Sequence, residues 1–348
     1  MKDLLFIFLY PLSKIYWLII SIRNLLFEIG IFKITKVSVP VISVGNITLG
    51  GNGKTPTVES IISILLKKKI KVAVISRGYK RKTSGLKIVS DGNSILCSRE
   101  EAGDEAIQVS NKFPSVIVIV DEKRVRAANY AINNFGVKVI ILDDGFQHRW
   151  IYRDLNLVIF NESTLKEKRD LIPAGNYREP MKSLSRSDAA VIYSNQNNFL
   201  NLDQYWEDIL PTKKIHCRLQ IDKIENTADK HSLKINNLKR QNVLIFSGIA
   251  KPERFNSLLR EEGILPNLHY FFPDHHWYTK KDNELIMSKI KNYNIKTVLT
   301  TEKDYSRMST DFCNQLSESV TFGIVSVTTV FENELEWEKL ILSTFDKY

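Results

Sequence analysis

A glycine-rich segment between an apolar strand pattern and an apolar helix pattern constrains the fold of this chain more than any other feature. Residues 37–44 form a buried strand pattern, residues 45–55 read GNITLGGNGKT, and residues 55–69 have the apolar period of a helix. Glycines let the backbone curl so that several N–H groups point at one phosphate, and the helix N-terminus adds its positive dipole end. The arrangement predicts a nucleotide-binding phosphate loop rather than an ordinary glycine-rich turn.

The residues of this loop have distinct predicted roles in holding a nucleotide. Lys54 is expected to reach the β- and γ-phosphates, and the Thr55 hydroxyl is expected to bind Mg²⁺. Pro56 is tolerated because the first turn of a helix leaves its N–H groups without intrahelical partners. The predicted nucleotide-binding residues are Thr48, Leu49, Gly50, Gly51, Asn52, Gly53, Lys54 and Thr55, with Thr48 in place of the usual first glycine.

Strand and helix patterns alternate along the chain, which predicts a mainly parallel sheet covered by helices on both faces. The length of 348 residues exceeds what one hydrophobic core usually supports, so we expect two domains. The predicted strands are 37–44, 72–76, 116–120, 137–142, 155–160, 189–193, 243–247, 297–301 and 321–325, and the predicted helices are 55–69, 100–112, 124–134, 252–262, 280–292 and about 333–345.

A polar, Asn/Lys-rich stretch over residues 213–241 separates two α/β patterns. It contains one alternating strand pattern, at 215–221, so a short β-ribbon linker is expected there. The predicted fold class is therefore α/β, with a P-loop domain on a parallel sheet and a smaller C-terminal α/β domain. The predicted division is 1–35 for an N-terminal helix, 36–212 for the P-loop domain, 213–241 for the linker and 242–348 for the smaller domain.

The N-terminal segment is apolar, but charged residues interrupt it at Lys14 and Arg23. Neither uninterrupted run reaches the roughly 20 residues needed to span a bilayer, and no small-residue cleavage site follows, as it would in a secretory signal. Tyr16 and Trp17 stand beside basic residues, which is typical of helices that lie in the headgroup plane of a membrane. We expect a membrane-associating helix here; a helix packed on the protein's own core is the alternative.

The composition of the chain limits the classes of molecule that it is expected to bind. The formal net charge is +10, which favours anionic partners such as phosphorylated ligands or an acidic membrane face. Aromatic residues interleaved with basic ones at the density of a nucleic-acid interface are absent, so no nucleic acid is expected. Cys97, Cys217 and Cys313 are widely spaced and suit a reducing compartment rather than a disulfide framework or a CxxC metal site. No obligate protein partner is evident.

Two pairs of acidic residues are candidates for metal binding and catalysis. An apolar strand pattern ends at Asp143 and Asp144, the Walker B arrangement in which a strand delivers a carboxylate to position Mg²⁺ beside the phosphate loop. The alternative is a turn whose aspartates cap a helix. Asp104 and Glu105 open a helical pattern, where they either complement the helix dipole or serve as a catalytic carboxylate and a metal-linked one.

Histidines and basic residues supply further candidates. His275 and His276 are adjacent and face different ways, so they do not form a shared metal site, and the usual zinc spacings are absent. One of them could act as a base or an orienting partner at a domain cleft, and a surface turn is the alternative. Basic residues at 77–82, at 123–124 and at Arg178 are candidates for phosphate binding or for solvated surface charge.

Taken in order, these motifs resemble the tetraacyldisaccharide 4′-kinase family, the lipid A 4′-kinases of Gram-negative bacteria. The DDGFQH segment together with RGY and PAG-x-x-RE is far more specific than a phosphate loop alone. Asn176 and Tyr177 stand where the family more often has Pro or Leu. The matching segments are VGNITLGGNGKTPTV (44–58), SRGYKRK (76–82), GDEA (103–106), DEKRVRAA (121–128), LDDGFQHR (142–149), DLIPAGNYREP (170–180), SRSDA (185–189), FSGIAKPERF (246–255), FPDHHW (272–277) and TTEKD (300–304).

The resemblance implies a P-loop kinase-type fold and a specific reaction. The family transfers the γ-phosphate of ATP to the 4′-hydroxyl of tetraacyldisaccharide 1-phosphate, which forms lipid IVA in lipid A biosynthesis, and it requires Mg²⁺. It works on the cytoplasmic face of the bacterial inner membrane, and its hydrophobic N-terminal helix is membrane-associating. A peripheral or monotopic location on that face is therefore expected for this chain.

The resemblance also implies roles for individual residues. In the family, the Asp of the GDE motif pairs with the first His of the DH motif to activate the sugar hydroxyl; here these are Asp104 and His275. Lys54 and Arg124 would neutralise phosphate charge. The remaining carboxylates serve the metal or its surroundings, with their roles not divided among them. The implied catalytic residues are Asp104, His275, Lys54, Arg124 and Asp144, and the implied metal ligands are Thr55, Glu105 and Asp143.

Three other functions compete with this interpretation. A GTPase would need Asn-Lys-x-Asp and usually Asp-x-x-Gly, and neither string occurs in the chain. A nucleotide-dependent membrane scaffold would need the phosphate loop and the N-terminal helix, but not Asp104, His275 or a second domain. A kinase of another polar lipid or sugar stays open on the motifs alone.

Overall fold

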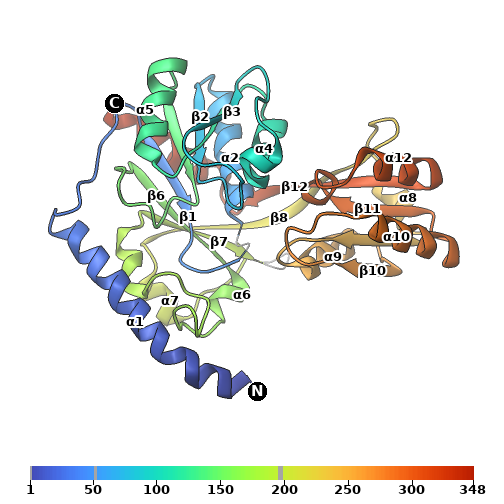
Figure 1. The fold of residues 1–348 in the computed structure, drawn as a ribbon, viewed down its shortest axis with the longest axis horizontal. Coiled ribbons are helices and arrows are strands. Elements are labelled where there is room, and N and C mark those ends of the chain that lie inside the picture. Colours follow the sequence, from blue (N-terminus) through green and yellow to red (C-terminus); the bar gives the residue numbers. More distant parts are fainter. Residues whose placement is uncertain (1, 51–52, 195–198) are drawn as a thin grey trace. The chain divides into compact units, whose positions relative to one another are not determined.

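The computed structural model describes residues 2–50, 53–194 and 199–348 (Figure 1). The chain divides into two compact units. The first unit contains Met1–Arg218 and Val330–Tyr348, and the second contains Leu219–Thr329. The chain leaves the first unit along the strand β8 (Lys213–Asn226) and returns to it along β12 (Thr321–Phe331).

The first unit is built on a sheet with the strand order β8-β7-β6-β1-β5-β2-β4-β3. Its neighbouring strands from β8 to β4 pair in parallel, and β3 pairs antiparallel with β4 at the edge. The apolar runs are buried along their whole length, as expected of parallel strands covered on both faces. The strands are β1 (Val41–Gly45), β2 (Val72–Ser76), β3 (Lys87–Asp91), β4 (Ile117–Val120), β5 (Val139–Asp143), β6 (Leu155–Asn161) and β7 (Ala189–Ser194).

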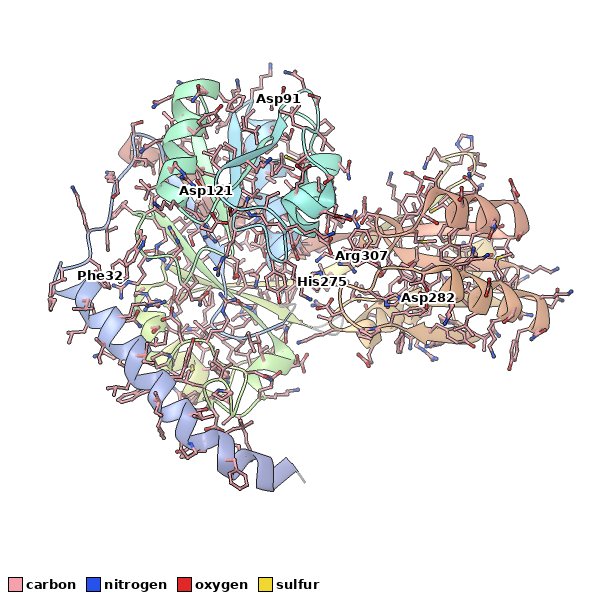
Figure 2. The ribbon with its side chains drawn as sticks, viewed as in Figure 1. Phe32, Asp91, Asp121, His275, Asp282 and Arg307 are labelled. Atoms are coloured by element: carbon pink, nitrogen blue, oxygen red, sulfur yellow. The ribbon has the colours of Figure 1, made fainter. Side chains whose placement is uncertain are left out.

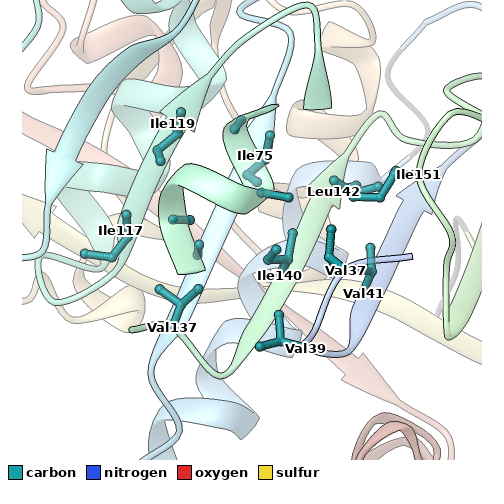
Figure 3. Close-up of a cluster of buried hydrophobic side chains, with 14 residues drawn as sticks. Val37, Val39, Val41, Ile75, Ile117, Ile119, Val137, Ile140, Leu142 and Ile151 are labelled. Carbon is teal, nitrogen blue, oxygen red and sulfur yellow. The ribbon is translucent and has the colours of Figure 1, made fainter. Parts of the chain in front are cut away.

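Helices of the first unit follow most of its strands and cover the sheet (Figure 1). The close-up in Figure 3 shows one covered face, where Ile75, Ile119 and Ile140 belong to one buried apolar cluster. The helices are α1 (Lys2–Glu28), α2 (Lys54–Lys67), α3 (Arg99–Ala102), α4 (Asp104–Lys112), α5 (Arg124–Phe135), α6 (Glu162–Leu165), α7 (Gln204–Ile209) and α13 (Glu334–Leu342), with 3₁₀ helices η1 (Met181–Arg186) and η2 (Ser343–Lys347).

The strand order brings the predicted nucleotide-binding segments together. β1 lies between β5 and β6, and Val44 pairs in register with Asp143. The carboxyl ends of parallel strands meet at one edge of a sheet, so the loop after β1 and the aspartates after β5 are neighbours.

The second unit has its own four-stranded order, β10-β9-β11-β12, in which the described pairs are parallel. Apolar clusters around Val243 and around Leu244, adjacent residues of β9 whose side chains alternate, form the core on its two faces. The remaining elements are the strands β9 (Val243–Ser247), β10 (Leu268–Phe271) and β11 (Thr297–Thr301), and the helices α8 (Ile235–Leu238), α9 (Pro252–Glu261), α10 (Lys280–Asn292), α11 (Glu302–Tyr305) and α12 (Thr310–Ser319).

The structure corrects two of the predicted elements. The first strand begins at Val41 instead of residue 37. Val37 and Val39 are buried because they pack on the hydrophobic core, and they lie before the strand. The predicted helix over 100–112 is broken at Gly103, whose φ of +90° ends α3 and begins α4.

The unit boundaries also differ from the predicted ones. Residues 213–226 are one long strand that pairs with β7, so about half of the stretch 213–241, predicted as a short β-ribbon linker, is a strand that begins within the first unit. The C-terminal helix α13 belongs to the first unit: Trp337 is fully buried, and its indole Nε1 donates a hydrogen bond to Ser60 Oγ at 2.8 Å. The apolar period of a helix predicts that one face is buried, but it does not indicate which domain's core that face packs on.

None of the described helices, α1 included, is both long enough and apolar enough to cross a bilayer.

Candidate active site

The phosphate loop (residues 48–55) adopts a backbone that its glycines make possible. Gly50 and Gly53 have φ values of +93° and +101°, in the region that side chains other than glycine rarely adopt. Gly53 also lies so close to Tyr193 that a Cβ at residue 53 would meet the aromatic ring at 2.5 Å. Thr55 is buried in the first turn of α2. The predicted loop residues Gly51 and Asn52 lie outside the described residues.

Lys54 and Asp144 form an ion pair beside the loop. The Lys54 ammonium lies 3.1 Å from Asp144 Oδ1 and donates a hydrogen bond to Asn46 Oδ1 at 3.3 Å. Asp144 has a φ of +52°, a left-handed conformation that aspartate tolerates better than most residues. Gly145 follows with its N–H bonded to the Val44 carbonyl at 3.0 Å, which anchors this turn to β1. The predicted neighbourhood of Lys54 and Asp144 is thus present.

Arg178 has more contacts with the residues beside the phosphate loop than the sequence pattern predicted. Its guanidinium donates three hydrogen bonds of 3.2 Å to the carboxylate of Asp144 and another to Gln147 Oε1. The sequence marked Arg178 only as a phosphate-binding candidate or a surface charge. Its position in the PAG-x-x-RE motif was the available signal. Burial alone would raise the pKa of Asp144, but Lys54 and Arg178 outweigh it and hold this pKa below its ordinary value.

The PAG segment (residues 170–180) carries Arg178 and pairs directly with the phosphate loop. The Arg178 N–H donates to the Ile47 carbonyl at 2.7 Å, and the Leu49 N–H donates to the Asn176 carbonyl at 2.8 Å. Thr48 and Tyr177 form an antiparallel bridge. These contacts hold the first residues of the loop, including the predicted nucleotide-binding residues Thr48 and Leu49.

Asp143, a metal-ligand candidate, ends β5 and is in register with Val44, which precedes the phosphate loop. In the described part of the chain, no group of three or more His, Cys, Asp or Glu side chains is arranged to hold a metal ion unaided. Mg²⁺ at nucleotide sites takes one or two carboxylates together with substrate phosphate oxygens and water. The Thr55 hydroxyl, in the first turn of α2, and the Asp143 carboxylate, at the end of β5, are oxygen ligands of the kind that such a site takes.

Asp104 and Glu105 occupy the first turn of α4. Gly103 is required before them, since a Cβ there would lie 3.0 Å from the Tyr79 carbonyl oxygen and its φ is positive. Arg99 Nε lies 3.6 Å from Asp104 Oδ1. Both the dipole interpretation and the catalytic interpretation of these carboxylates are compatible with this position.

A cavity of about 560 Å³ in the first unit is lined by basic and aromatic side chains. Arg124 lines it and is nearly fully buried. Its Nε, like Nε2 of His148 in the same lining, has no hydrogen-bond partner among the described residues. Buried polar atoms of this kind usually have a ligand or water as partner. The other lining residues are Ile31, Phe32, Lys33, Thr35, Lys123, Val125, Arg126, Asn129 and Trp150.

Electrostatics link this cavity to the carboxylates after β5. Burial lowers the pKa of Arg124, whereas the negative charges of Asp144 and Asp143 raise it. The two carboxylates are therefore near enough to interact electrostatically with this guanidinium. Burial first, and then the charge of Arg124, lower the pKa of His148 to about 4, which keeps its imidazole neutral at pH 7.

Not every basic candidate serves this site. Arg81, from the predicted phosphate-binding cluster over 77–82, has a buried side chain that pairs with Glu122 and donates to the Gly85 carbonyl at 2.8 Å. These contacts fix the loop after β2, so Arg81 is structural.

Helix α1 packs on the first unit through polar groups. Ser13 Oγ donates to the Leu171 carbonyl at 2.8 Å and accepts from the Ala174 N–H at 2.9 Å. The Tyr16 hydroxyl donates to the carbonyl of Arg178 at 2.9 Å. All three contacts join α1 to the PAG segment.

The opposite side of α1 presents apolar side chains outward. Asn24 on the inner side is buried, whereas Phe8 is 69 % exposed and Leu18 is 52 % exposed. The inner side also buries apolar Ile20 and Phe27, so α1 is apolar on both sides, whereas an ordinary amphipathic surface helix has a polar outer face. The other exposed apolar residues of α1 are Tyr10, Leu12, Ile15, Trp17, Ile19, Ile22 and Leu25.

His275 belongs to the second unit and Asp104 to the first, so their pairing stays a prediction. His275 lies between β10 and α10, and its N–H donates to the Gly248 carbonyl at 3.1 Å. The neighbouring His276 stacks on Phe272 and bonds through Nε2 to Asp282 at 3.0 Å, which gives it a structural role.

Comparison with known proteins identifies relatives along nearly the whole chain. A family model described as tetraacyldisaccharide-1-P 4′-kinase matches residues 5–346. Proteins named tetraacyldisaccharide 4′-kinase are 35% identical in Chlorobaculum parvum, over 97% of this chain and 94% of the relative, and 36% identical in Desulfotalea psychrophila, over 99% and 97%. The crystal structure of LpxK from Aquifex aeolicus in complex with ATP superposes with a TM-score of 0.76 at 34% identity, covering 96% of this chain and 98% of that one.

Proposed function

The chain belongs to the tetraacyldisaccharide-1-P 4′-kinase family, and we propose that the residues around its phosphate loop carry out the family's reaction at a membrane surface. It is an ATP-dependent kinase that phosphorylates the 4′-hydroxyl of tetraacyldisaccharide 1-phosphate, the step that forms lipid IVA in lipid A biosynthesis. The observation that carries the assignment of residues is the convergence of Lys54, Asp144 and Arg178 beside the loop.

Phosphoryl transfer depends mainly on positioning and on neutralising charge, because the protein has little covalent chemistry to do. Asp144 pairs with Lys54 and Arg178 beside the loop, and the charges of Asp144 and Asp143 act on Arg124 in the lining of the cavity. In our proposal these three cations stabilise the charge that develops on the transferred phosphoryl group. Asp144 keeps Lys54 and Arg178 in place.

Mg²⁺ bound with ATP would neutralise the phosphate oxygens and align them for transfer. Thr55 and Asp143 are the proposed ligands, and Glu105 in the first turn of α4 is proposed as a further ligand or as the partner of one.

Asp104 is the proposed acceptor of the proton from the sugar hydroxyl. The hydroxyl O–H bond breaks, its oxygen forms a bond to the γ-phosphorus, and the bond from that phosphorus to ADP breaks. A carboxylate is a sufficient base because it takes the proton only as bonding develops. His275 is the proposed partner of Asp104 in this step.

The lipid acceptor is proposed to enter from the membrane beside α1. The outward apolar side of α1 suits insertion at the depth of the headgroups, and the basic cavity follows α1 directly, since Phe32 and Lys33 line it. Arg124, Lys123 and Arg126 in the same lining suit an anionic sugar phosphate. We place the protein peripherally on the cytoplasmic face of the inner membrane, with the acyl chains of the acceptor left in the bilayer.

The test is transfer of label from γ-labelled ATP to tetraacyldisaccharide 1-phosphate in mixed micelles with Mg²⁺. Wild-type protein is expected to label the lipid, and Asp104→Asn is expected to abolish labelling while ATP still binds. Asp311→Asn is the matched control, because Asp311 is an exposed aspartate in the first turn of α12. If the wild-type protein binds ATP but transfers no label, the alternative of a nucleotide-dependent membrane scaffold is favoured. Equal losses of lipid labelling in the two variants would mean that Asp104 acts only by complementing the helix dipole and not as the base.

A further inference from the structure

His275 is held in an unusual backbone conformation within the second unit. Its φ of +64° is left-handed, a conformation that residues other than glycine rarely adopt and that persists when the surroundings enforce it. The His275 N–H bonds to the Gly248 carbonyl at 3.1 Å. Gly248 itself has no room for a side chain, since a Cβ would lie 2.9 Å from Cβ of His276.

Arg307 supports this turn and also contacts the imidazole. Its side chain is buried, one guanidinium nitrogen donates to the Gly248 carbonyl at 2.9 Å, and the other lies 3.3 Å from Nδ1 of His275. Figure 2 shows Arg307 and His275 next to each other in the second unit. Both nitrogens of one planar fork are therefore used on the same turn.

Asp304 fixes the other side of the turn. It is fully buried, and it accepts hydrogen bonds from the Gly248 N–H at 2.7 Å and from the Tyr278 hydroxyl at 2.9 Å. Its Oδ1 lies 3.8 Å from the guanidinium of Arg307. Arg307 thus has a buried counter-charge, and its fork has a fixed direction.

A guanidinium has donors only, so a ring nitrogen that faces it at hydrogen-bond distance has to accept. We infer that Arg307 is a positioning residue that holds His275 in the neutral tautomer with its proton on Nε2. On the Nε2 side the Asp274 carboxylate lies 3.8 Å away, and a carboxylate accepts and does not donate. His275 then presents an N–H and not a lone pair.

This assignment deepens the proposed function and rests on the proposed pairing of His275 with Asp104. An Nε2–H can donate a hydrogen bond to a carboxylate, which holds the carboxylate ionised and oriented, but it cannot take a proton from the sugar. The proton of the 4′-hydroxyl therefore goes to Asp104, and His275 stays a donor throughout the step. A histidine acting as the base through Nε2 would need the opposite tautomer, with the proton on Nδ1.

The direct test is the proton position on the His275 ring. Two-bond ¹H–¹⁵N spectra of full-length protein labelled at histidine distinguish the two tautomers, and His275→Gln assigns the signals. The wild-type spectrum is expected to show the proton on Nε2. Arg307→Lys keeps a charge but lacks the fork, so the His275 signals are expected to move toward the other tautomer. His276, bonded to Asp282, serves as the internal reference that stays unchanged.

The kinetic test separates positioning from folding. Arg307→Lys is expected to lower kcat by roughly 10–100-fold with little change in the KM for ATP, as misplacement of a catalytic group does. Arg260→Lys is the control, because Arg260 is an exposed arginine of α9. A wild-type proton on Nδ1, or unchanged His275 signals in the folded Arg307→Lys protein, would overturn the inference. If the tautomer moves as expected but His275→Gln keeps full kcat, the proposed catalytic role of His275 fails and the assignment to Arg307 stands.

Discussion

Glu179 is the residue at which a single change is expected to separate α1 from the rest of the first unit. The carboxylate is fully buried, and it accepts hydrogen bonds from Arg23 at 3.0 Å, from Asn24 at 3.2 Å and from Arg186 at 2.9 Å. Two of these partners lie on α1 and the third follows the PAG segment. Glu179→Gln keeps the shape of the side chain and removes the charge, so it tests the electrostatic contribution.

The expected loss follows from burial. Removing one member of a buried ion pair costs about 3–5 kcal/mol, because the partner charge stays behind uncompensated. Gln still accepts one hydrogen bond, so the lower end, about 3 kcal/mol, applies to Glu179→Gln. At about 2–4 °C per kcal/mol for a domain of this size class, the Tm is expected to fall by roughly 6–12 °C. The control is Glu100→Gln, whose pair with Lys82 is shorter at 2.6 Å but exposed on both sides, and which is expected to cost less than about 1 kcal/mol.

The pH dependence gives a second signature of the same carboxylate. Burial alone would raise the pKa of Glu179, but Arg186 and Arg23 outweigh it and hold this pKa below its ordinary value of 4.5. A carboxylate with a lowered folded pKa stabilises the fold above its unfolded pKa and loses that contribution as the pH falls through the folded pKa. The difference between wild type and Glu179→Gln is therefore expected to be constant near neutral pH and to shrink below pH 4.5.

The assay is urea and thermal unfolding of both variants, with hydrogen exchange of α1 as the local readout. Exchange in α1 is expected to rise in Glu179→Gln and to stay unchanged in Glu100→Gln. Equal losses of stability in the two variants would refute the reasoning, because pair distance and not burial would then decide the energy. A large loss of stability without faster exchange in α1 would refute the claim that Glu179 holds this helix.

Three further outcomes follow from the site and the helix. Lys54→Met is expected to lower kcat by about 100-fold or more, since it removes a preorganised positive charge, and initial-rate kinetics check this; unchanged kcat would remove Lys54 from the site. His148 has a pKa of about 4, below its ordinary 6.5, so the unfolded chain binds its proton more readily and the protein is expected to lose stability as the pH falls between these values. Urea unfolding at pH 7 and pH 5 is expected to show a smaller loss in His148→Phe, and an equal loss would contradict the assigned burial. The double change Leu18→Glu with Ile22→Glu is expected to abolish sedimentation with anionic lipid vesicles while leaving the Tm unchanged, because both side chains are exposed; retained sedimentation would contradict an interfacial role for α1.

The parallel core was predictable because its signal is local and strong. The runs that became β2, β5 and β7 are short, apolar and β-branched, and each is buried along its whole length. Errors arose where an apolar residue served another purpose. Val37 and Val39 pack on the core without pairing as a strand, and α13 returns to the first unit although it follows the second in sequence. No local pattern records such a return.

The candidate site divides in the same way. The position of Asp143 and Asp144 beside the phosphate loop was predictable, because motifs at the ends of parallel strands meet at one edge of the sheet. Arg178 was predicted only as a phosphate-binding candidate or a surface charge, and Arg307 was not singled out. Their contacts with Asp144 and His275 join residues that are distant in sequence. A solitary arginine in a loop looks like surface charge until its partner is known.

The PAG segment shows why a loop without regular structure can be among the most specific parts of a sequence. Gly175 has no space for a side chain, since a Cβ would lie 2.1 Å from the Asp170 carbonyl oxygen, and this closes the segment into a compact turn. The turn presents carbonyl groups to α1 on one side, through Ser13 and Tyr16, and backbone groups to the phosphate loop on the other. Arg178 belongs to both contacts: its carbonyl oxygen accepts from α1, and its guanidinium holds Asp144. Helix α1 and the carboxylate that pairs with Lys54 are thus both bound by one residue, Arg178, so the backbone and the side chain of this residue constrain the segment together.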